Sequence, residues 1–493
     1  MDKKHQKLYS ESFEDFMSSD RFLDLERLPE RPIPAHQPTH GGAKLASVVD
    51  LERFLSAPDE LHPFRFSQVS LLTSGQSGAY LPIYNKSVYF PETVRRQNTM
   101  IISKIGGGKT TRYLLPSLFE DIANRNSSVF WIDTKGDIEP IITQWMKFAR
   151  PGEKPVVLNF ADIQRTTHSI NLIGDNPPLD ELFEDVSAFC DAATESNSAK
   201  DSPFWSQTGA RWLVACLQLL QHLFGKASLA DAHFLIEGDI KRLMELLDRH
   251  QDQIHFASGM LSSLRSGSHN ADTNVVNLGS YLRHFINRNV CATTSHSELK
   301  FDHLFRKPTV FILEINQADV IRYRPLFNMF ISQLFRAISK FAEKCPNNRL
   351  PRPLNAYADD FAALGRVNQA ESYINTLRSR DFRFSVAIQS MEQLSHLYGP
   401  AAQELMAGFG TKIFQPHLEQ ADAEWASRHA GHMTAVDIET SGTSDGQILE
   451  HSGRSVPRKL LTPDEIILSP YHWSYGCRAA TVFAPDTVSY THL

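Results

Sequence analysis

TMIISKIGGGKTTRYLLPSLFEDIA, residues 99–123, is the stretch that decides the fold. Its first four residues form a short apolar run that is typical of a buried strand, and the spacing from residue 110 onwards predicts a helix. Between them, SKIGGGKT (103–110) fits the last three positions of the phosphate-binding pattern GxxxxGK[ST], with Ser103 where the first glycine is usual. Because a strand precedes this turn and a helix follows it, a phosphate-binding loop (P-loop) is favoured over a plain glycine turn.

The residue types of this turn suit a nucleotide with Mg²⁺. Backbone amides in a Gly-rich turn point inward and bind phosphate oxygens, and the N-terminus of the following helix helps them. Lys109 would reach the β- and γ-phosphates, and Thr110 would offer its hydroxyl to Mg²⁺. The predicted nucleotide-binding residues are Ser103, Gly106, Gly107, Gly108, Lys109, Thr110 and Thr111.

Further apolar runs extend the pattern on both sides of a helical segment. Strand, helix and strand in succession indicate a parallel sheet covered by helices, whereas residues 179–290 carry helical spacing. We expect an α/β fold, a P-loop NTPase (RecA-like) domain with a mostly parallel sheet, interrupted by an all-α domain. The strands are expected at 99–102, 129–133, 155–160, 309–316, 354–360 and 384–390, and the domains as an N-terminal arm or linker (1–79), the nucleotide-binding domain in two parts (80–178 and 291–493) and the all-α domain (179–290).

Composition limits the class of protein. The 493 residues are 42% hydrophobic and 22% charged, which excludes a chain that is disordered throughout, a collagen and a membrane-embedded bundle. With 50 basic and 56 acidic residues, a nucleic-acid site would need its basic residues gathered in one groove or pore. Five scattered cysteines without a CxxC indicate a reducing compartment. No signal peptide or spanning segment is evident, so we expect a cytoplasmic protein.

A P-loop needs an acidic partner at the end of another strand, and Asp359-Asp360, closing LNAYADD, is the best candidate. The first carboxylate would hold Mg²⁺, largely through water, and the second would polarise the attacking water. A pair that caps the next helix is the alternative. Asp133 and Asp137 are rivals of second rank, because their strand follows the P-loop helix at once and is expected to neighbour the P-loop strand.

Two polar features follow the acidic pair. Gln389 ends the strand of VAIQS, where an amide can orient water or sense the γ-phosphate, although a capping or solvated Gln is an equal alternative. Arg378, Arg380 and Arg383 precede that strand. One of them could stabilise transition-state charge across a subunit interface, while a solvated face or a nucleic-acid contact is the more common use of such a cluster.

The order and spacing of these motifs resemble the type IV secretion coupling proteins, ATPases that deliver DNA or protein substrates to a conjugation or secretion channel. The resemblance runs from about Tyr80 to the C-terminus. Beside the P-loop it includes WIDTKGD (131–137), HSINLI (168–173), PFWSQTGARWLVACLQLL (203–220), ADDFAALG (358–365), IQSMEQLSHLYG (388–399) and LLTPDEI (460–466).

The resemblance implies roles, cofactors and partners. ATP and Mg²⁺ would be the cofactors, and a homo-hexamer would move single-stranded DNA with relaxase, or protein effectors, towards the channel components. The protein would lie peripherally at the inner face of the bacterial cell membrane. The implied catalytic residues are Lys109, Asp360, Gln389 and Arg378, which would act in trans, and the implied metal ligands are Thr110 and Asp359.

Two departures from the family pattern stand out. Asp360 replaces the usual Glu, and its shorter arm predicts slow hydrolysis or reliance on a neighbouring subunit. The usual N-terminal transmembrane segments are missing, which indicates a soluble subclass or attachment through a partner. Two alternatives stay open: another DNA-translocating P-loop ATPase, and an ATP-binding receptor or scaffold that hardly hydrolyses ATP.

Overall fold

The structure is a computed structural model. It describes residues 64–68, 71–74, 80–83, 87–90, 92–195, 203–267, 269–442, 448–468, 471–472, 477–478, 480–484 and 491–492. Most of the predicted N-terminal arm, residues 1–63, lies outside the described residues.

The core of the molecule is a nine-stranded sheet in the order β17-β16-β11-β5-β10-β9-β6-β8-β7. The seven strands from β11 to β7 are parallel, and β16 and β17 join them antiparallel. The prediction of an α/β fold with a mostly parallel sheet is therefore confirmed. The strands are β5 (Thr99–Ile102), β6 (Ser128–Asp133), β7 (Val156–Asn159), β8 (Val310–Glu314), β9 (Leu354–Ala358), β10 (Phe382–Ile388), β11 (Thr411–Phe414), β16 (Thr481–Phe483) and β17 (Thr491–His492).

The position of β6 corrects one expectation. Its strand follows the P-loop helix along the chain, yet β10 and β9 lie between β5 and β6 in the sheet. The expectation that β6 neighbours the P-loop strand was therefore wrong. The crossover connections place β10 beside β5 and β9 beside β10, so the ends of these two strands, at Asp359 and Gln389, lie nearer to the P-loop strand than the end of β6 does.

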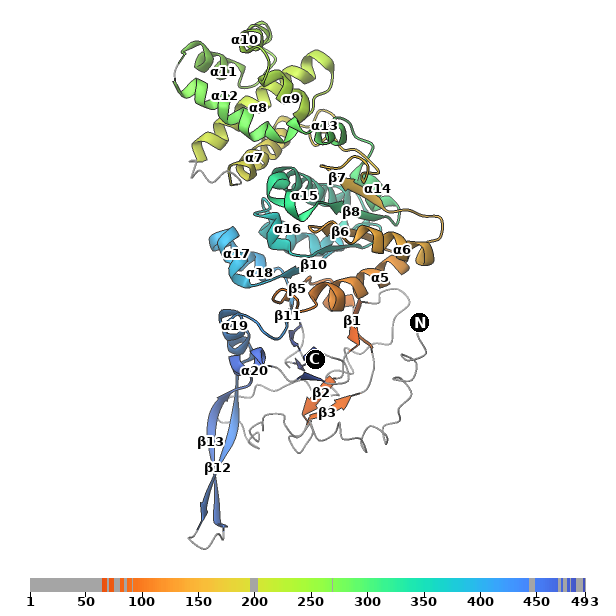
Figure 1. The fold of residues 1–493 in the computed structure, drawn as a ribbon, viewed down its shortest axis with the longest axis vertical. Coiled ribbons are helices and arrows are strands. Elements are labelled where there is room, and N and C mark those ends of the chain that lie inside the picture. The colour runs from red at the N-terminus through yellow and green to blue at the C-terminus, as the bar shows by residue number, and fades with distance from the viewer. Residues whose placement is uncertain are drawn as a thin grey trace.

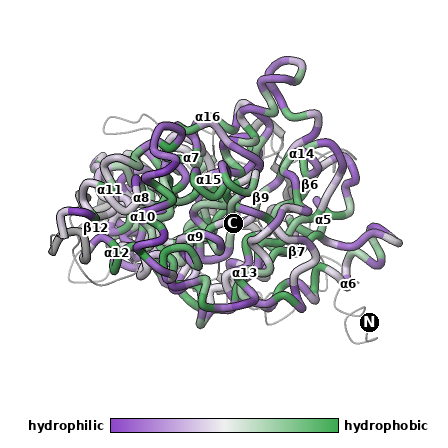
Figure 2. The backbone as a smooth tube through the Cα atoms, turned by 90° about the horizontal axis from the view of Figure 1, so that it is seen from above, coloured by the Kyte–Doolittle hydropathy of each residue, from purple (hydrophilic) through white to green (hydrophobic). Residues whose placement is uncertain are grey.

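Helices cover both faces of the sheet (Figure 1). On one face, Ile101 and Trp131 belong to a core that includes residues of α5 (Leu115–Ala123) and α6 (Glu139–Ala149). On the other face, their chain neighbours Met100 and Phe130 pack in a core that includes residues of α15 and α16. This alternation is the period of two that a strand buried on both sides requires. Figure 2 shows the hydrophobic residues gathered in the interior around β9 and α15.

A helical segment interrupts the sheet between β7 and β8 and lies beyond α15 (Figure 1). Its helix α7 packs against both α15 and α8. The helical spacing predicted here is thus matched by helices, while the domain boundaries themselves stay a prediction. The elements from this segment to α15 are α7 (Leu179–Glu195), α8 (Pro203–Phe224), α9 (Leu229–Ile236), α10 (Ile240–Arg249), α11 (Ala257–Arg265), α12 (His269–Tyr281), η4 (Leu282–Ile286), α13 (Arg288–Thr294), α14 (Phe301–Arg306), η5 (Gln317–Asp319) and α15 (Val320–Glu343).

A helix that spans a membrane needs about 20 consecutive, predominantly apolar residues. Among the described residues, no single helix is long and apolar enough to cross a bilayer. Ser206–Phe224 and Leu229–Ile236 meet the combined requirement of length and hydropathy only as a pair, and that pair is bent by 104°.

The remaining elements lie around the sheet. An antiparallel hairpin of β12 (His432–Gly442) and β13 (Ile448–Lys459) projects from the body (Figure 1). The others are β1 (Phe64–Gln68), β2 (Leu71–Ser74), β3 (Tyr80–Ile83), β4 (Ser87–Phe90), α4 (Glu92–Arg95), η3 (Thr110–Leu114), η6 (Pro346–Asn348), η7 (Phe361–Leu364), α16 (Ala370–Leu377), η8 (Arg378–Arg380), α17 (Met391–Tyr398), η9 (Gly399–Ala401), α18 (Ala402–Ala407), α19 (Gln420–Ala430), α20 (Pro463–Ile467), β14 (Tyr471–His472) and β15 (Cys477–Arg478).

Candidate nucleotide-binding site

The turn after β5 explains how Ser103 replaces a glycine. Ser103 is fully buried, and a β-carbon at Gly107 would overlap its Oγ atom. Gly107 therefore supplies the space that the larger residue at position 103 needs. Gly106 and Gly108 have φ angles of 80° and 84°, in the left-handed region that favours glycine. The turn is thus a close-fitted unit rather than a loose glycine loop.

The chain passes from this turn directly into a helix. The Arg112 amide donates a hydrogen bond of 2.8 Å to the Gly108 carbonyl, and Lys109 precedes the first helical residue of η3. Lys109 is buried, whereas Thr111 is exposed and its Oγ1 lies 3.5 Å from the Gly108 carbonyl. Of these two side chains, Lys109 points towards the acidic pair, whereas a nucleotide contact of Thr111 stays a prediction.

The predicted basic and acidic residues meet at the carboxyl ends of β5 and β9. Lys109 Nζ lies 2.6 Å from Asp360 Oδ1, and Thr110 Oγ1 donates a hydrogen bond of 2.8 Å to Asp359 Oδ2. The structure therefore brings together the P-loop and the acidic pair chosen from the sequence.

A second lysine joins this group, and the sequence reasoning missed it. Lys135 Nζ lies 2.6 Å from Asp359 Oδ2 and 3.5 Å from Asp360 Oδ2. Two ammonium groups thus face two carboxylates. The signal for this residue was the lysine within WIDTKGD, a stretch in which only the acidic residues were considered.

Asp133 builds the turn that carries Lys135. Its carboxylate accepts hydrogen bonds of 2.9–3.0 Å from the amides of Lys135, Gly136 and Ile138. A β-carbon at Gly136 would lie 2.7 Å from Asn316 Oδ1, so this turn fits tightly against the loop after β8. Since Asp133 is committed to backbone amides and Asp137 is exposed, neither rival competes with Asp359 and Asp360.

Asp360 has an unusual backbone. Its φ of 54° and ψ of 55° are left-handed, a conformation that Asp adopts more readily than most residues with longer side chains. Burial raises the pKa of Asp360, but the hydrogen bond and charge of Lys109, the charge of Lys135 and a hydrogen bond from Gln389 hold the pKa below its ordinary value. Gln389 thus reaches the acidic pair.

The contacts of this site fit a magnesium nucleotide. Asp359 is buried, and no protein atom within the described residues hydrogen-bonds to its Oδ1. Carboxylate and hydroxyl oxygens are ligands that Mg²⁺ prefers. An available carboxylate oxygen beside the Thr110 hydroxyl is therefore the donor set that the metal needs, and the Gly-rich turn offers its amides to phosphates.

The three arginines before β10 differ in their surroundings. Arg378 is exposed in η8, at the amino end of β10, whereas the P-loop lies at the carboxyl ends of the parallel strands. Arg380 donates a hydrogen bond of 3.0 Å to the Asn348 carbonyl, and Arg383 is buried within β10. Arg378 is therefore placed away from the nucleotide site of its own subunit.

Residues 81–471 match the family described as type IV secretory system conjugative DNA transfer. The chain belongs to this family. The resemblance to type IV secretion coupling proteins expected from the motifs is therefore confirmed. The exposed Arg378, the P-loop and the acidic pair all lie within the matched residues.

Individual relatives agree. The protein VirD4 of Agrobacterium fabrum (strain C58) is 26% identical over 184 residues, and VirD4 of Rhizobium rhizogenes gives the same identity over the same length. Each match covers 36% of this chain and about a quarter of the relative.

Solved structures share the fold over nearly the whole chain. The unbound bacterial conjugative coupling protein TrwB (TrwBdeltaN70) superposes with a TM-score of 0.65 at 17% identity, covering 93% of both chains. The plasmid coupling protein TrwB in complex with ADP and Mg²⁺ superposes with a TM-score of 0.64 at 16% identity, covering 93% of this chain and 94% of its own. The fold is therefore that of the coupling proteins.

Proposed function

We propose that the chain is an ATP-driven coupling protein that recruits substrate and moves it to a type IV secretion channel. The main support for this proposal is that Lys109 and Thr110 contact Asp360 and Asp359 at the carboxyl ends of β5 and β9. The TrwB structures with ADP and Mg²⁺ and with an ATP analogue support ATP and Mg²⁺ as cofactors. Family membership supports single-stranded DNA with its relaxase as the substrate, and protein effectors are the alternative cargo.

The residues of the site would have separate roles in binding phosphate, binding Mg²⁺ and orienting water. The amides of residues 106–111 and the Lys109 ammonium would hold the phosphates, and Thr110 and Asp359 would hold Mg²⁺, which neutralises charge on the β- and γ-phosphates. When Lys109 moves to phosphate, Asp360 loses its 2.6 Å partner. Its carboxylate is then available to orient the attacking water, with Gln389 beside it.

A ring supplies what one subunit lacks. Arg378 is exposed at the amino ends of the parallel strands, and the P-loop lies at their carboxyl ends. Its side chain would therefore act on the nucleotide of a neighbouring subunit. We infer a homo-hexamer in which Arg378 stabilises transition-state charge in trans. Contacts with channel components would hold this ring at the inner face of the cell membrane.

The proposal is tested by measuring ATP hydrolysis of the full chain with and without single-stranded DNA. DNA should stimulate the wild type, and Lys109→Ala should abolish both hydrolysis and substrate transfer. Lys104→Ala is the matched control, because Lys104 lies in the same turn but pairs with Glu419 on the surface. Hydrolysis that survives in Lys109→Ala would remove the P-loop from the mechanism.

A weakly hydrolysing receptor is the second candidate. It is favoured by the shorter acid Asp360 and by its ion pair with Lys109, which satisfies both groups without nucleotide. Binding of ATP and relaxase by a wild type whose slow hydrolysis does not respond to DNA would select this function over a motor.

A further inference from the structure

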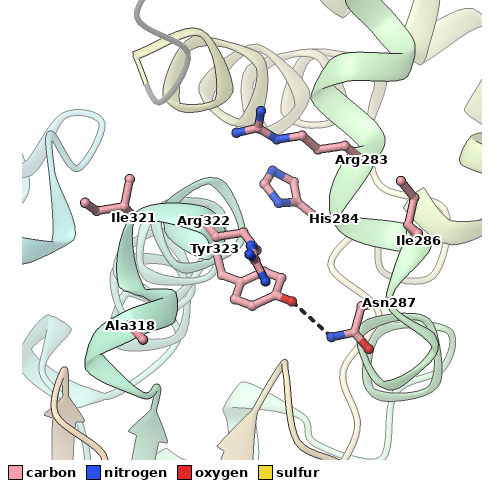
Figure 3. Close-up of a pocket in the computed structure, with 8 residues that line it drawn as sticks. All are labelled: Arg283, His284, Ile286, Asn287, Ala318, Ile321, Arg322 and Tyr323. Carbon is pink, nitrogen blue, oxygen red and sulfur yellow. Dashed lines mark hydrogen bonds between the residues drawn. The ribbon is translucent and has the colours of Figure 1, made fainter.

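A cavity of about 670 Å³ lies between the helical segment and the start of α15 (Figure 3). One wall comes from the end of η4 and the residue that follows it, and the other from η5 and the first turn of α15. Its volume is within the range of about 300–1,000 Å³ that is usual for ligand sites. It is separate from the nucleotide site, since no lining residue belongs to the P-loop or to the acidic pair.

The lining is cationic. It includes Arg283 from one wall and Arg322 from the other, and none of the described residues that line it carries a carboxylate. Asp319 lies 3.4 Å from Arg322 Nη1, but that arginine side chain is 64% exposed. An exposed pair of this kind is weak, so Arg322 can exchange Asp319 for a ligand. Guanidinium groups bind phosphate through paired N–H donors.

A buried imidazole faces the same space. His284 is only 2% exposed, and neither of its ring nitrogens has a hydrogen-bond partner within the described residues. Burial, together with the charges of Arg283 and Arg322, lowers the pKa of His284 to about 3. The ring is therefore neutral, with one N–H to donate. A buried polar group without a partner is costly, and an anionic oxygen would satisfy it.

Apolar side chains stand beside these donors. Ile286 is 74% exposed and Ile321 58% exposed, one on each wall (Figure 3). A hydrogen bond of 3.0 Å from Asn287 Nδ2 to the Tyr323 hydroxyl joins the walls. The cavity thus combines anion donors with apolar surface, and a single strand of DNA offers both phosphates and bases as their counterparts.

We propose that this cavity binds the phosphate backbone of single-stranded DNA where the helical segment meets the sheet. The choice of DNA rests on the proposed function, whereas the choice of a phosphate ligand rests on Arg283, Arg322 and His284. Contacts of this kind carry no sequence preference, as a transfer protein requires.

The test is the binding of fluorescein-labelled oligo(dT) to the full chain, measured by fluorescence anisotropy at several salt concentrations. Arg283→Gln/Arg322→Gln should bind about tenfold more weakly, and the salt slope should fall by about 1.4, or roughly 0.7 for each lost phosphate contact. Arg242→Gln/Arg249→Gln, which removes two exposed arginines from α10, is the matched control and should bind like the wild type.

A second variant guards against misfolding. Ile321→Glu places a negative charge at an exposed rim position and should also weaken binding. ATP affinity should stay unchanged in every variant. Wild-type binding that none of the cavity variants alters would overturn this site and leave the proposed function standing, whereas a wild type that binds no DNA would overturn the proposed function's choice of cargo as well. Competition by inorganic phosphate or poly-glutamate that exceeds competition by unlabelled oligo(dT) would assign the cavity to a free anion or an acidic protein and overturn the DNA assignment.

Discussion

The nucleotide site and the cavity between the helical segment and α15 differ in how their charged groups are paired. In the first, Lys109 and Lys135 face Asp359 and Asp360 at 2.6 Å. In the second, two arginines lie near a neutral imidazole that has no partner within the described residues. A ligand must therefore displace two buried or half-buried ion pairs in the first site, whereas in the second it replaces the exposed Asp319–Arg322 pair and supplies a partner to His284. Nucleotide affinity therefore depends on how easily the lysines leave, and anion affinity on how much charge the cavity holds.

After the complete loss expected from Lys109→Ala, the largest effect is expected from Arg378, which lies in neither the nucleotide site nor the cavity of its own subunit. Arg378→Ala should lower ATP turnover about 100-fold or more while ATP binding stays intact, because an arginine acting in trans stabilises transition-state charge. The measurement is steady-state hydrolysis beside nucleotide binding.

Mixed rings separate a trans role from a structural one. Where an Arg378→Ala subunit supplies the P-loop and a Lys109→Ala neighbour supplies the arginine, activity should partly return. Rings shown to be mixed that gain no activity would assign Arg378 to structure or to DNA, and Arg380 and Arg383 would then be examined.

The close fit of the P-loop sharpens the first half of the comparison. Gly107→Ala should weaken ATP binding about tenfold to 100-fold, since the added methyl group overlaps Ser103 Oγ. Adding Ser103→Gly should recover much of the loss. Binding of a fluorescent nucleotide measures both variants. Gly259→Ala, at an open position, is the control, and a double variant as weak as Gly107→Ala would contradict the coupling.

Asp360→Glu tests whether the ion pair is built around the shorter acid. The sequence alone treats the shorter arm as a defect, but the left-handed backbone and the 2.6 Å contact with Lys109 favour Asp. We expect hydrolysis to fall about tenfold, a change of about 1.4 kcal/mol in the barrier. A faster Asp360→Glu enzyme would show that arm length limits turnover. Asp360→Asn, which keeps the backbone preference, measures the contribution of the charge.

Lys135→Met should ease the exchange of partners at Asp359. Without this ammonium, Mg²⁺ meets less competition for the carboxylate. The Mg²⁺ concentration that gives half-maximal nucleotide binding should therefore fall several-fold. Lys147→Met, an exposed substitution on α6, is the control. If the half-saturating Mg²⁺ concentration is unchanged or higher, Lys135 is instead a phosphate-binding group.

A change in stability rather than in activity is expected at Glu314, a buried carboxyl at the end of β8. Burial raises its pKa to about 7 although Arg165 opposes the shift. A raised carboxyl pKa stabilises the folded state below pH 4.5, and this contribution is lost as the pH rises through about 7. The free energy of unfolding of the wild type should therefore fall between pH 5 and 8. In Glu314→Gln this fall should be smaller by about 2 kcal/mol. Urea unfolding measures this, with Glu245→Gln on the surface as control, and equal pH slopes would contradict it.

The sequence was sufficient wherever a motif is local. The P-loop carries its own strand and helix signals, and the apolar runs of the sheet are continuous because parallel strands are buried on both faces. The acidic pair Asp359 and Asp360 was found because a P-loop requires one.

What depends on long-range arrangement was less accessible. The order of strands is decided by crossovers, so the distance between β5 and β6 in the sheet could not be read from their adjacency in the chain. Lys135 was missed because its role comes from a turn that Asp133 holds, not from a residue pattern. The cavity joins residues 283–287 to residues 318–323, which no motif connects.

The tight contact at Gly136 has a mechanical consequence. The turn that positions Lys135 leaves no clearance for a β-carbon against Asn316, and Asn316 directly precedes η5, whose Ala318 lines the cavity. A closely packed contact transmits a displacement to the neighbouring residues. Under the proposed function, a movement of Lys135 away from Asp359 on nucleotide binding would shift its turn against Asn316, which leads into the wall of the cavity.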